Sequence, residues 1–508
     1  MDNFNTQQEN GEQNPFERVP DFAAQAEFEA LMKPKRKTNW FTVVSVGLLA
    51  FTVGLVMAYM IFNVDTPTQA HIADDEFSEL LTVFDMLQNT HYFFDEENDL
   101  VRGAIDGMIA ATGDFYTRFF TMSDFDGAMN HLRESFYGIG AEVTVINGDA
   151  TIVTPMPGSP AESYGVMPGD VVLSVDGVNV RDENLSEVID RIRGEYGTVV
   201  RLGILRNGSD LLYIDITRGR IVNETVTTDV FESEGKTIGL IRVSTFGEAT
   251  QRDFREAVDE LDNLGIDGLI VDLRNNGGGY LNAVNGMVSY LLPSGLPITS
   301  ATDRDGRETL HSTRGNNSHR LDVDIVTIIN GGSASASEIF AAAMMESGGF
   351  EVLGTTSFGK GTVQQSRQIN ADSMLQLTIQ AWRTPHGNLI EGHGVEPTIY
   401  VEPSAFLFIP QVNLGEEEAL TYDMVHNGIM SAQLILETLG YEVTRTDGYF
   451  DTTTQTAIRL FQSDNDLDVT GEINSQTATA LTMALREKAR NPQYDAQIQA
   501  AIDWFLGE

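Results

Sequence analysis

The sequence predicts a multidomain α/β protein with one membrane-spanning helix near its start. Its 508 residues exceed what a single hydrophobic core usually holds. Residues 237–401 alternate apolar strand-like runs with helical runs, which predicts an α/β core. Short alternating strands precede this core, and amphipathic helices follow it. With 42% hydrophobic residues, the chain has enough apolar side chains to fold each of these parts.

Composition excludes several classes of function. The formal net charge of −42 would repel a phosphate backbone and an anionic lipid surface, so we expect no nucleic-acid partner. The chain has no cysteine, which excludes disulfides and thiolate metal sites. No glycine-rich phosphate loop is present, and His386 and His393 lack carboxylates at metal-ligand spacing, so we assign these histidines to loops. We therefore expect no cofactor and no metal.

The N-terminal region predicts an uncleaved signal anchor. Residues 40–62 carry no formal charge and would form a helix about 35 Å long, enough to cross a bilayer. Basic residues precede the segment and acidic residues follow it, so residues 1–39 are expected to be a disordered cytoplasmic tail. The alternative is a cleaved signal peptide, but the apolar run is long and no small-residue cleavage site follows closely.

Residues 63–128 predict a polar spacer followed by a helical segment. Apolar residues recur at helical spacing between Phe77 and Leu87, and a second helical run covers residues 100–111. We expect these helices to pack against the catalytic core or against a second copy of the chain. No residue here suggests chemistry.

Residues 129–220 predict a small β domain. Strand-like runs at 141–145, 151–153, 170–175, 199–205 and 211–216 are separated by turn residues, with a helix at 186–192. Residues 137–140 read Tyr-Gly-Ile-Gly, and Ser-Pro-Ala-Glu at 159–162 is followed by Gly-Val-Met-Pro-Gly-Asp at 165–170. This combination resembles a PDZ domain. The resemblance implies that a substrate tail binds at Tyr137, Gly138, Ile139 and Gly140; the alternative is a plain turn that uses glycine for its backbone freedom.

The expected core, residues 221–405, contains the candidate chemistry. Residues 331–338 read Gly-Gly-Ser-Ala-Ser-Ala-Ser-Glu and open a predicted helix, where the helix dipole favours a nearby oxyanion. Lys360 is one of only three lysines after residue 40, and it is flanked by glycines. A serine hydroxyl needs a base to become nucleophilic, and a lysine serves only if burial lowers the pKa of its amine. The glycine-rich turn at 272–279 can present backbone N–H groups to negative charge.

Together these motifs resemble the C-terminal processing peptidases, over roughly residues 75–405. The resemblance implies that Ser335 is the nucleophile and Lys360 the general base, with Gln364 assisting the lysine. It also implies an oxyanion hole made by the backbone amides of Gly278 and Ala336, and a homodimer. The neighbouring serines Ser333 and Ser337 remain alternatives for the nucleophile. Gly277 departs from the family pattern of proline or serine, so the choice between Gly277 and Gly278 stays open.

Residues 415–490 predict a small three-helix domain. Apolar residues at helical spacing near 429–439, 454–462 and 477–481 are separated by Asp-Gly-Tyr-Phe at 447–450 and by Val-Thr-Gly at 469–471. The pattern resembles the peptidoglycan-binding domain of cell-wall hydrolases. Asp451 departs from it, because the family commonly has glycine there. The alternative is a helical bundle that binds no glycan.

The sequence therefore predicts a membrane-anchored serine endopeptidase outside the cytoplasm of a Gram-positive-type envelope. It would cleave protein substrates near their C termini after the PDZ domain binds the tail. One alternative is a binding scaffold with a silent core, against which intact Ser335 and Lys360 argue. Another is a peptidoglycan hydrolase, but the core has neither a carboxylate pair nor a zinc motif.

Overall fold

The computed structural model describes residues 74–95, 99–146, 148–181, 183–206, 210–315, 321–412, 414 and 418–507. Across those ranges, no helix combines the length and apolar character needed to span a membrane. The expected tail, 1–39, and anchor, 40–62, lie outside the described residues, so both stay predictions. The chain divides into two compact units, Met1–Leu100 and Val101–Glu508.

The first unit contains helix α3 (Asp74–Thr90), which confirms the helix predicted from the spacing of Phe77 to Leu87. Several of its apolar side chains are exposed, namely Phe77, Leu80, Leu81, Val83, Met86 and Leu87. Helix α4 (Leu100–Ala111) begins at the last residue of this unit and has the predicted bounds. In the second unit, β1 (Arg118–Thr121), α5 (Met122–Met129) and η1 (Asn130–Leu132) follow α4.

The predicted β domain forms an antiparallel sheet with strand order β3-β4-β5-β7-β8, to which the short β6 (Val178–Asn179) is added. These strands are β3 (Ala141–Ile146), β4 (Asp149–Pro155), β5 (Val171–Val175), β7 (Val199–Arg206) and β8 (Asp210–Thr217). Helices α6 (Pro160–Ser163) and α7 (Leu185–Ile192) complete the domain. The strand that leads into this domain, β2 (Ser135–Gly138), pairs antiparallel with the strand that leaves it, β9 (Gly219–Val222).

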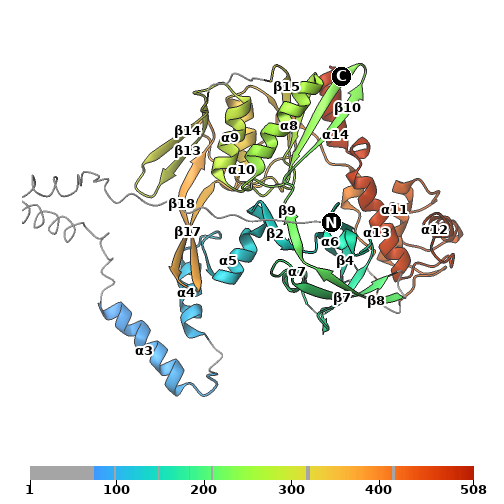
Figure 1. Cartoon of the computed structure of the whole chain (residues 1–508), viewed down its shortest axis with the longest axis horizontal. Coiled ribbons are helices and arrows are strands. Elements are labelled where there is room, and N and C mark those ends of the chain that lie inside the picture. The colour runs from blue at the N-terminus through green and yellow to red at the C-terminus, as the bar shows by residue number, and fades with distance from the viewer. Residues whose placement is uncertain are drawn as a thin grey trace, which may run out of the picture. The chain divides into compact units, whose positions relative to one another are not determined.

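The core is a six-stranded sheet with order β10-β11-β12-β15-β16-β19, parallel except for the β10–β11 pair. Its strands are β10 (Val226–Ser233), β11 (Lys236–Val243), β12 (Gly268–Asp272), β15 (Asp324–Ile329), β16 (Glu351–Gly354) and β19 (Ile399–Tyr400). Helices α8 (Thr250–Leu264), α9 (Leu281–Leu291) and α10 (Ala336–Glu346) lie together on one face (Figure 1). This confirms the α/β core.

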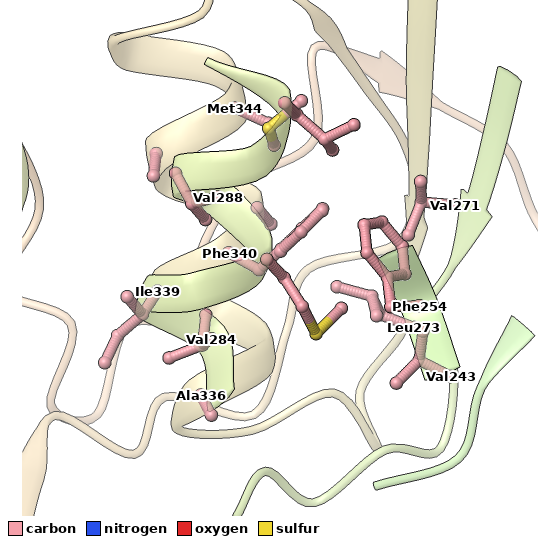
Figure 2. Close-up of a cluster of buried hydrophobic side chains, with 14 of the residues drawn as sticks. Val243, Phe254, Val271, Leu273, Val284, Val288, Ala336, Ile339, Phe340 and Met344 are labelled. Atoms are coloured by element: carbon pink, nitrogen blue, oxygen red, sulfur yellow. The ribbon is translucent and has the colours of Figure 1, made fainter. Parts of the chain in front are cut away.

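Alternation along the core strands explains why both faces of the sheet are covered. Ile241 and Val243 on β11 point toward α8–α10, whereas Ile238 and Leu240 point to the opposite face. Figure 2 shows the first face, where Phe340 of α10 lies among side chains of the strands and of α9. Each fully buried aliphatic or aromatic side chain of this kind contributes about 1.5–3 kcal/mol to folding.

The second face is covered by helix α14 (Ala496–Leu506), which was not predicted. Its buried side chains Ile498, Ala501, Ile502 and Phe505 pack against strand residues such as Ile238. The chain leaves the core after β19, forms the C-terminal helical domain and returns through η3 (Pro492–Tyr494) to the sheet. The last helix of the chain is therefore part of the peptidase core, although more than ninety residues separate it from β19.

A second sheet lies beside the core and consists of β1, β13 (Pro297–Asp303), β14 (Glu308–Ser312), β17 (Thr362–Asn370) and β18 (Ser373–Arg383). Strand β1, from the N-terminal segment, pairs antiparallel with β18. This pairing brings the segment before the β domain next to the loop that carries Lys360.

The C-terminal domain has the three predicted helices, α11 (Asn427–Leu439), α12 (Thr452–Asp464) and α13 (Ser475–Arg490). Two buried glutamines organise its loops in the same way. Gln433 accepts from Gly448 N and donates to Thr454 Oγ1, and Gln462 accepts from Gly471 N and donates to Thr477 Oγ1. Asp451, which replaces the usual glycine, caps α12 by accepting from the backbone N–H of residue 454.

Candidate active site

Ser335 stands where the loop after β15 enters α10, as the sequence predicted. Its backbone has φ 56° and ψ −111°, a conformation that a residue with a side chain rarely adopts. The surroundings must compensate for this strain, which typically costs 1–3 kcal/mol and occurs preferentially at functional sites. The side chain is half-buried.

The three serines of the run differ in their surroundings. Ser333 is fully buried and donates from Oγ to the Leu273 carbonyl at 2.8 Å. Ser337 is also fully buried and donates from Oγ to the Asn276 carbonyl at 2.7 Å. Both hydroxyls therefore tie the helix start to the glycine-rich turn. Of the three, only Ser335 is partly exposed.

The glycine-rich turn after β12 packs directly against Ser335. A Cβ on Gly278 would lie 2.8 Å from the Ala334 carbonyl oxygen, 2.9 Å from Ser335 Cβ and 3.0 Å from Ala336 N. Gly278 also has φ +102°, so this position requires glycine for both reasons. The two segments proposed to hold an oxyanion are thus adjacent.

Buried Asn276 fixes the turn in its present conformation. Its Nδ2 donates to the Val243 carbonyl at 2.8 Å, and its Oδ1 accepts from Gly278 N at 2.9 Å. Gly278 N–H is therefore already engaged. Among the described residues, neither Gly277 N–H nor Ala336 N–H has an acceptor.

One carboxylate connects the nucleophile loop to the lysine loop. Glu338 is fully buried, and its Oε2 accepts from Ser335 N at 2.6 Å and from Lys360 N at 2.9 Å. Its Oε1 accepts from Ser357 Oγ at 2.6 Å and from Gly359 N at 2.7 Å. Burial raises the pKa of Glu338, and these four hydrogen bonds oppose the rise.

Lys360 lies in the loop between β16 and β17 with its amine against an aromatic ring. Its Nζ is 4.9 Å from the centroid of Tyr116, which comes from the N-terminal segment just before β1. Burial lowers the pKa of the Lys360 amine; Glu391 and Glu338 raise it, and Arg118 lowers it further. The backbone is also fixed, because Trp382 Nε1 donates to the Lys360 carbonyl at 2.9 Å. The amine is therefore partly shielded from water, which favours its neutral form.

The links expected between the side chains of Ser335, Lys360 and Gln364 are not made in this state. These three residues are described, and no hydrogen bond joins Lys360 Nζ to Ser335 Oγ or to Gln364. Instead, the Gln364 amide donates to Thr362 Oγ1 at 2.9 Å and to Thr378 Oγ1 at 3.3 Å. The structure therefore brings the loops that carry Ser335 and Lys360 together, but it does not join the Ser335 hydroxyl to the Lys360 amine.

Comparisons with known proteins identify the family. Residues 237–401 match peptidase family S41, residues 151–206 match a PDZ domain, and residues 425–481 match a peptidoglycan binding domain. The chain is 33% identical over 471 residues to carboxy-terminal processing protease CtpB of Bacillus subtilis, covering 91% of this chain and 97% of that protein. The chain belongs to the carboxy-terminal processing proteases.

The chain is also similar to other processing proteases. The processing protease CtpA of Bacillus subtilis is 31% identical over 441 residues, which cover 86% of this chain and 92% of CtpA. A solved structure of a photosystem II D1 C-terminal processing protease is 27% identical, covers 64% of this chain and 92% of its own, and has a TM-score of 0.40. This member of the family is accordingly a serine-type peptidase with a PDZ domain.

In the PDZ domain of this processing protease, the four predicted tail-binding residues divide into two pairs. Tyr137 and Gly138 lie in β2 and pair with strand β9. Ile139 and Gly140 form the loop that leads into β3, and their backbone N–H groups have no acceptor among the described residues. Gly140 has φ +73°, and a Cβ there would lie 2.5 Å from Ser159 Cβ.

Strand β3 lies at the end of the sheet order, so its outer backbone edge has no strand partner within the described ranges. Such an edge can accept an added strand from a peptide, and the free N–H groups of the loop can receive a terminal carboxylate.

Sequence reasoning missed three residues of this site. The sequence analysis gives Glu338 no role of its own, although an acidic residue three positions after a helix-start serine is a signal for reciprocal capping. Asn276 and Tyr116 were not singled out. An asparagine before three glycines suggests side-chain support of a turn, whereas nothing local marks Tyr116, because its contact joins distant parts of the chain.

Proposed function

We propose that this protein is a membrane-anchored, extracytoplasmic serine endopeptidase of the Ser–Lys dyad type. It cleaves protein substrates near their C termini after the PDZ domain binds the substrate tail. The observation that carries this proposal is the Glu338 carboxylate, which accepts from the backbone N–H groups of both Ser335 and Lys360. A single buried group thereby sets the distance between the backbones of nucleophile and base.

The reaction follows the general course of serine peptidases. Neutral Lys360 Nζ takes the proton of Ser335 Oγ as Oγ bonds to the scissile carbonyl carbon. The carbonyl oxygen becomes an oxyanion near Ala336 N–H and Gly278 N–H. The resulting ammonium donates its proton to the leaving amine as the C–N bond breaks. A water molecule, deprotonated by Lys360, then attacks the acyl-enzyme and releases Ser335.

Two local rearrangements would complete the site. Lys360 Nζ must leave the Tyr116 ring for Ser335 Oγ, after which the Gln364 amide can turn from its two threonines toward the amine. Gly278 N–H must exchange the Asn276 oxygen for the oxyanion, whereas Ala336 N–H is already without an acceptor. Gly277 N–H is the alternative donor that needs no exchange. Each change involves one side chain or one peptide.

Cleavage of an unstructured reporter protein by the full-length enzyme in detergent tests the dyad. We expect Ser335→Ala and Lys360→Ala each to lower kcat/KM by at least about 10³-fold, with no further loss in the double variant, because the two residues act as one unit. Ser366→Ala, an exposed change on β17, serves as the control. Cleavage by either dyad variant at the wild-type rate would refute the dyad.

The role of the PDZ domain is tested with the same reporter carrying a free or an amidated C terminus. We propose that the Ile139 and Gly140 N–H groups hold the terminal carboxylate, so amidation should raise KM with little change in kcat. Gly140→Ala should have the same effect, because its Cβ would collide with Ser159. Equal KM values for the two reporters would exclude recognition of the carboxylate.

Location and assembly are proposals from the sequence and the matched domains. We propose that residues 40–62 anchor the enzyme with its catalytic part outside a Gram-positive-type membrane, and that the C-terminal domain binds peptidoglycan. Protease added to intact cells should then remove the catalytic domain, and the purified protein should co-sediment with isolated walls.

We also propose that the protein forms a homodimer, because helix α3 exposes an apolar face. The molecular mass measured by light scattering tests this proposal.

A further inference from the structure

The last helix of the chain does more than cover the core sheet, because the residue that caps it also contacts the glycine-rich turn. Asp495 begins α14 and accepts from the backbone N–H groups of Gln497 and Ile498. The same carboxylate binds Arg274, which lies two residues after β12 at the start of the turn. Asp495 Oδ1 accepts from Arg274 Nη1 at 2.9 Å, and Oδ2 lies 2.8 Å from Nη2.

Arg274 is held between two carboxylates with almost no solvent contact. Its Nε and Nη2 donate to Asp272 at 2.9 and 2.7 Å, so both acids bind it in two places. The exposed fractions of the side chains are 11% for Arg274, 6% for Asp272 and 13% for Asp495. Gln497 adds a bond to Nη1 at 3.0 Å and itself donates to the Val401 carbonyl. Loss of Asp495 would leave the guanidinium paired with Asp272 but would remove the Asp495 oxygens from Nη1 and Nη2, which weakens the hold on a buried donor group.

Arg274 is also connected to the oxyanion segment through the backbone that follows it. The next residue, Asn275, has φ 57° and donates from N to Asn330 Oδ1 at 2.9 Å. Asn276 then holds Gly278 N–H, which lies against Ser335 and Ala336. Asparagine tolerates this left-handed conformation, so the shape of the short segment depends on what holds its two ends. On the β12 side, the fixed end is the Asp272–Arg274–Asp495 cluster.

We propose that Asp495 of the C-terminal helix is a positioning residue of the peptidase: through Arg274 it holds the turn at 272–279 in register with Ser335. The proposal rests on the proposed oxyanion role of this turn. It gives the N-cap residue of α14 a role in positioning the turn, although this helix lies outside the peptidase match at 237–401. The C-terminal domain is consequently held to the core at both of its ends.

Two variants separate positioning from helix capping. Asp495→Ser keeps a cap acceptor for α14 but is too short to reach Arg274, whereas Asp495→Asn keeps the cap and one oxygen for Nη1. Asp503→Asn, an exposed change on the same helix, is the matched control. Ile502→Ala weakens the packing of the helix on the sheet without touching Arg274 and reports what instability alone does.

The test measures kcat, KM and inhibition by a peptidyl boronic acid, which mimics the oxyanion, on full-length enzyme. Rates are normalised to the fraction of molecules that a fluorophosphonate labels at Ser335. We expect Asp495→Ser to lower kcat by roughly 10- to 100-fold with KM nearly unchanged, and to weaken boronate inhibition by a similar factor. Asp495→Asn should lie between Asp495→Ser and the wild type. Asp503→Asn and Ile502→Ala should leave the normalised kcat unchanged.

Wild-type values of kcat and boronate inhibition in Asp495→Ser would overturn the proposal. The proposal would also fail if the lower kcat of Asp495→Ser returned to the wild-type value after normalisation, or if Ile502→Ala lowered the normalised kcat by the same factor. Ser335→Ala is measured alongside. If it still cleaves the reporter, the proposed dyad fails; if it is inactive while Asp495→Ser is normal, only the positioning role fails.

Discussion

The proposed active site has two sides, a nucleophile side around Ser335 and a base side around Lys360, and the two are held in different ways. On the nucleophile side, Ser333, Ser337 and Asn276 each bond to nearby backbone of the core, and the turn touches Ser335 directly. On the base side, the amine of Lys360 lies over the ring of Tyr116, and Gln364 bonds to two threonines instead of the amine.

This difference shows that the two sides of the site depend on different parts of the fold. The nucleophile side is built from strand-to-helix junctions of the core sheet, where the turn after β12 meets the helix start after β15, about sixty positions later in the chain. The base side depends on a second sheet, in which β1 from the N-terminal segment pairs with β18. In the proposed mechanism, the amine of Lys360 must move from the ring of Tyr116 before it meets Ser335.

The largest effect is expected at Glu338, the residue that belongs to both sides. Glu338→Ala removes the acceptor of four donors, two of them in buried and two in part-buried hydrogen bonds, which should lower the free energy of unfolding by about 2–4 kcal/mol. The activity of the folded fraction should also fall by at least about 10²-fold, because the backbones of Ser335 and Lys360 no longer bond to the same carboxylate. Urea unfolding and reporter cleavage measure the two quantities.

Glu256→Ala on the exposed side of α8 is the control for this variant, and it should change neither quantity. A Glu338→Ala enzyme of reduced stability but normal kcat would show that the carboxylate only supports the fold. The two sides of the site would then be positioned independently.

A smaller effect, visible mainly as a pH dependence, is expected at Tyr116. Burial is the largest cause of the lowered pKa of Lys360, and Glu391, Glu338 and Arg118 are the charged groups that act on it. Tyr116→Ala admits water, so the pKa of the amine should rise toward its ordinary value and the acidic limb of kcat/KM should move to higher pH. At neutral pH, activity should fall by about 10-fold, because less of the base is neutral.

Tyr116→Phe keeps the ring and should reproduce the wild-type profile. The ring face also attracts the ammonium, and loss of that attraction alone would lower the pKa. A limb that moves to lower pH in Tyr116→Ala would therefore mean that the attraction outweighs the exclusion of water, contrary to the assignment of burial as the main cause.

The smallest effect is expected at Gln364. If its amide contacts Lys360 only after the site assembles, Gln364→Ala should lower kcat by about 3-fold and leave KM unchanged. Gln365→Ala, at the exposed neighbouring position on β17, should be neutral. An unchanged kcat in Gln364→Ala would remove the glutamine from the mechanism and leave Lys360 as the sole member of the base side.

The features that the sequence predicted correctly are those encoded locally. Apolar strand-like runs between helical runs predicted the core strands and α10, and helical spacing predicted α3, α4 and the three helices of the C-terminal domain. At Asp451, the local sequence predicts the structure better than the family pattern does. This residue departs from the family pattern, yet an aspartate before a helix is a common N-cap, and it has that role here.

The features that were not predicted depend on contacts between distant residues. Arg274 and Asp495 are 221 positions apart, and no local pattern connects an arginine after a strand to a cap near the end of the chain. Helix α14 was missed for the same reason: its apolar face matches the far face of a sheet whose strands are buried on both sides. The contact of Tyr116 with Lys360 likewise follows from the pairing of β1 with β18.

The central claim is that the desolvated amine of Lys360 activates Ser335, and the rate of fluorophosphonate labelling tests it most directly. Peptide mapping by mass spectrometry identifies the labelled residue, and the rate is measured against pH in wild type and Lys360→Ala. We predict labelling at Ser335, a rate that rises with pH through a pKa below 10.5, and loss of that labelling in Lys360→Ala. Labelling of another serine, or an equal rate in Lys360→Ala, would contradict the account.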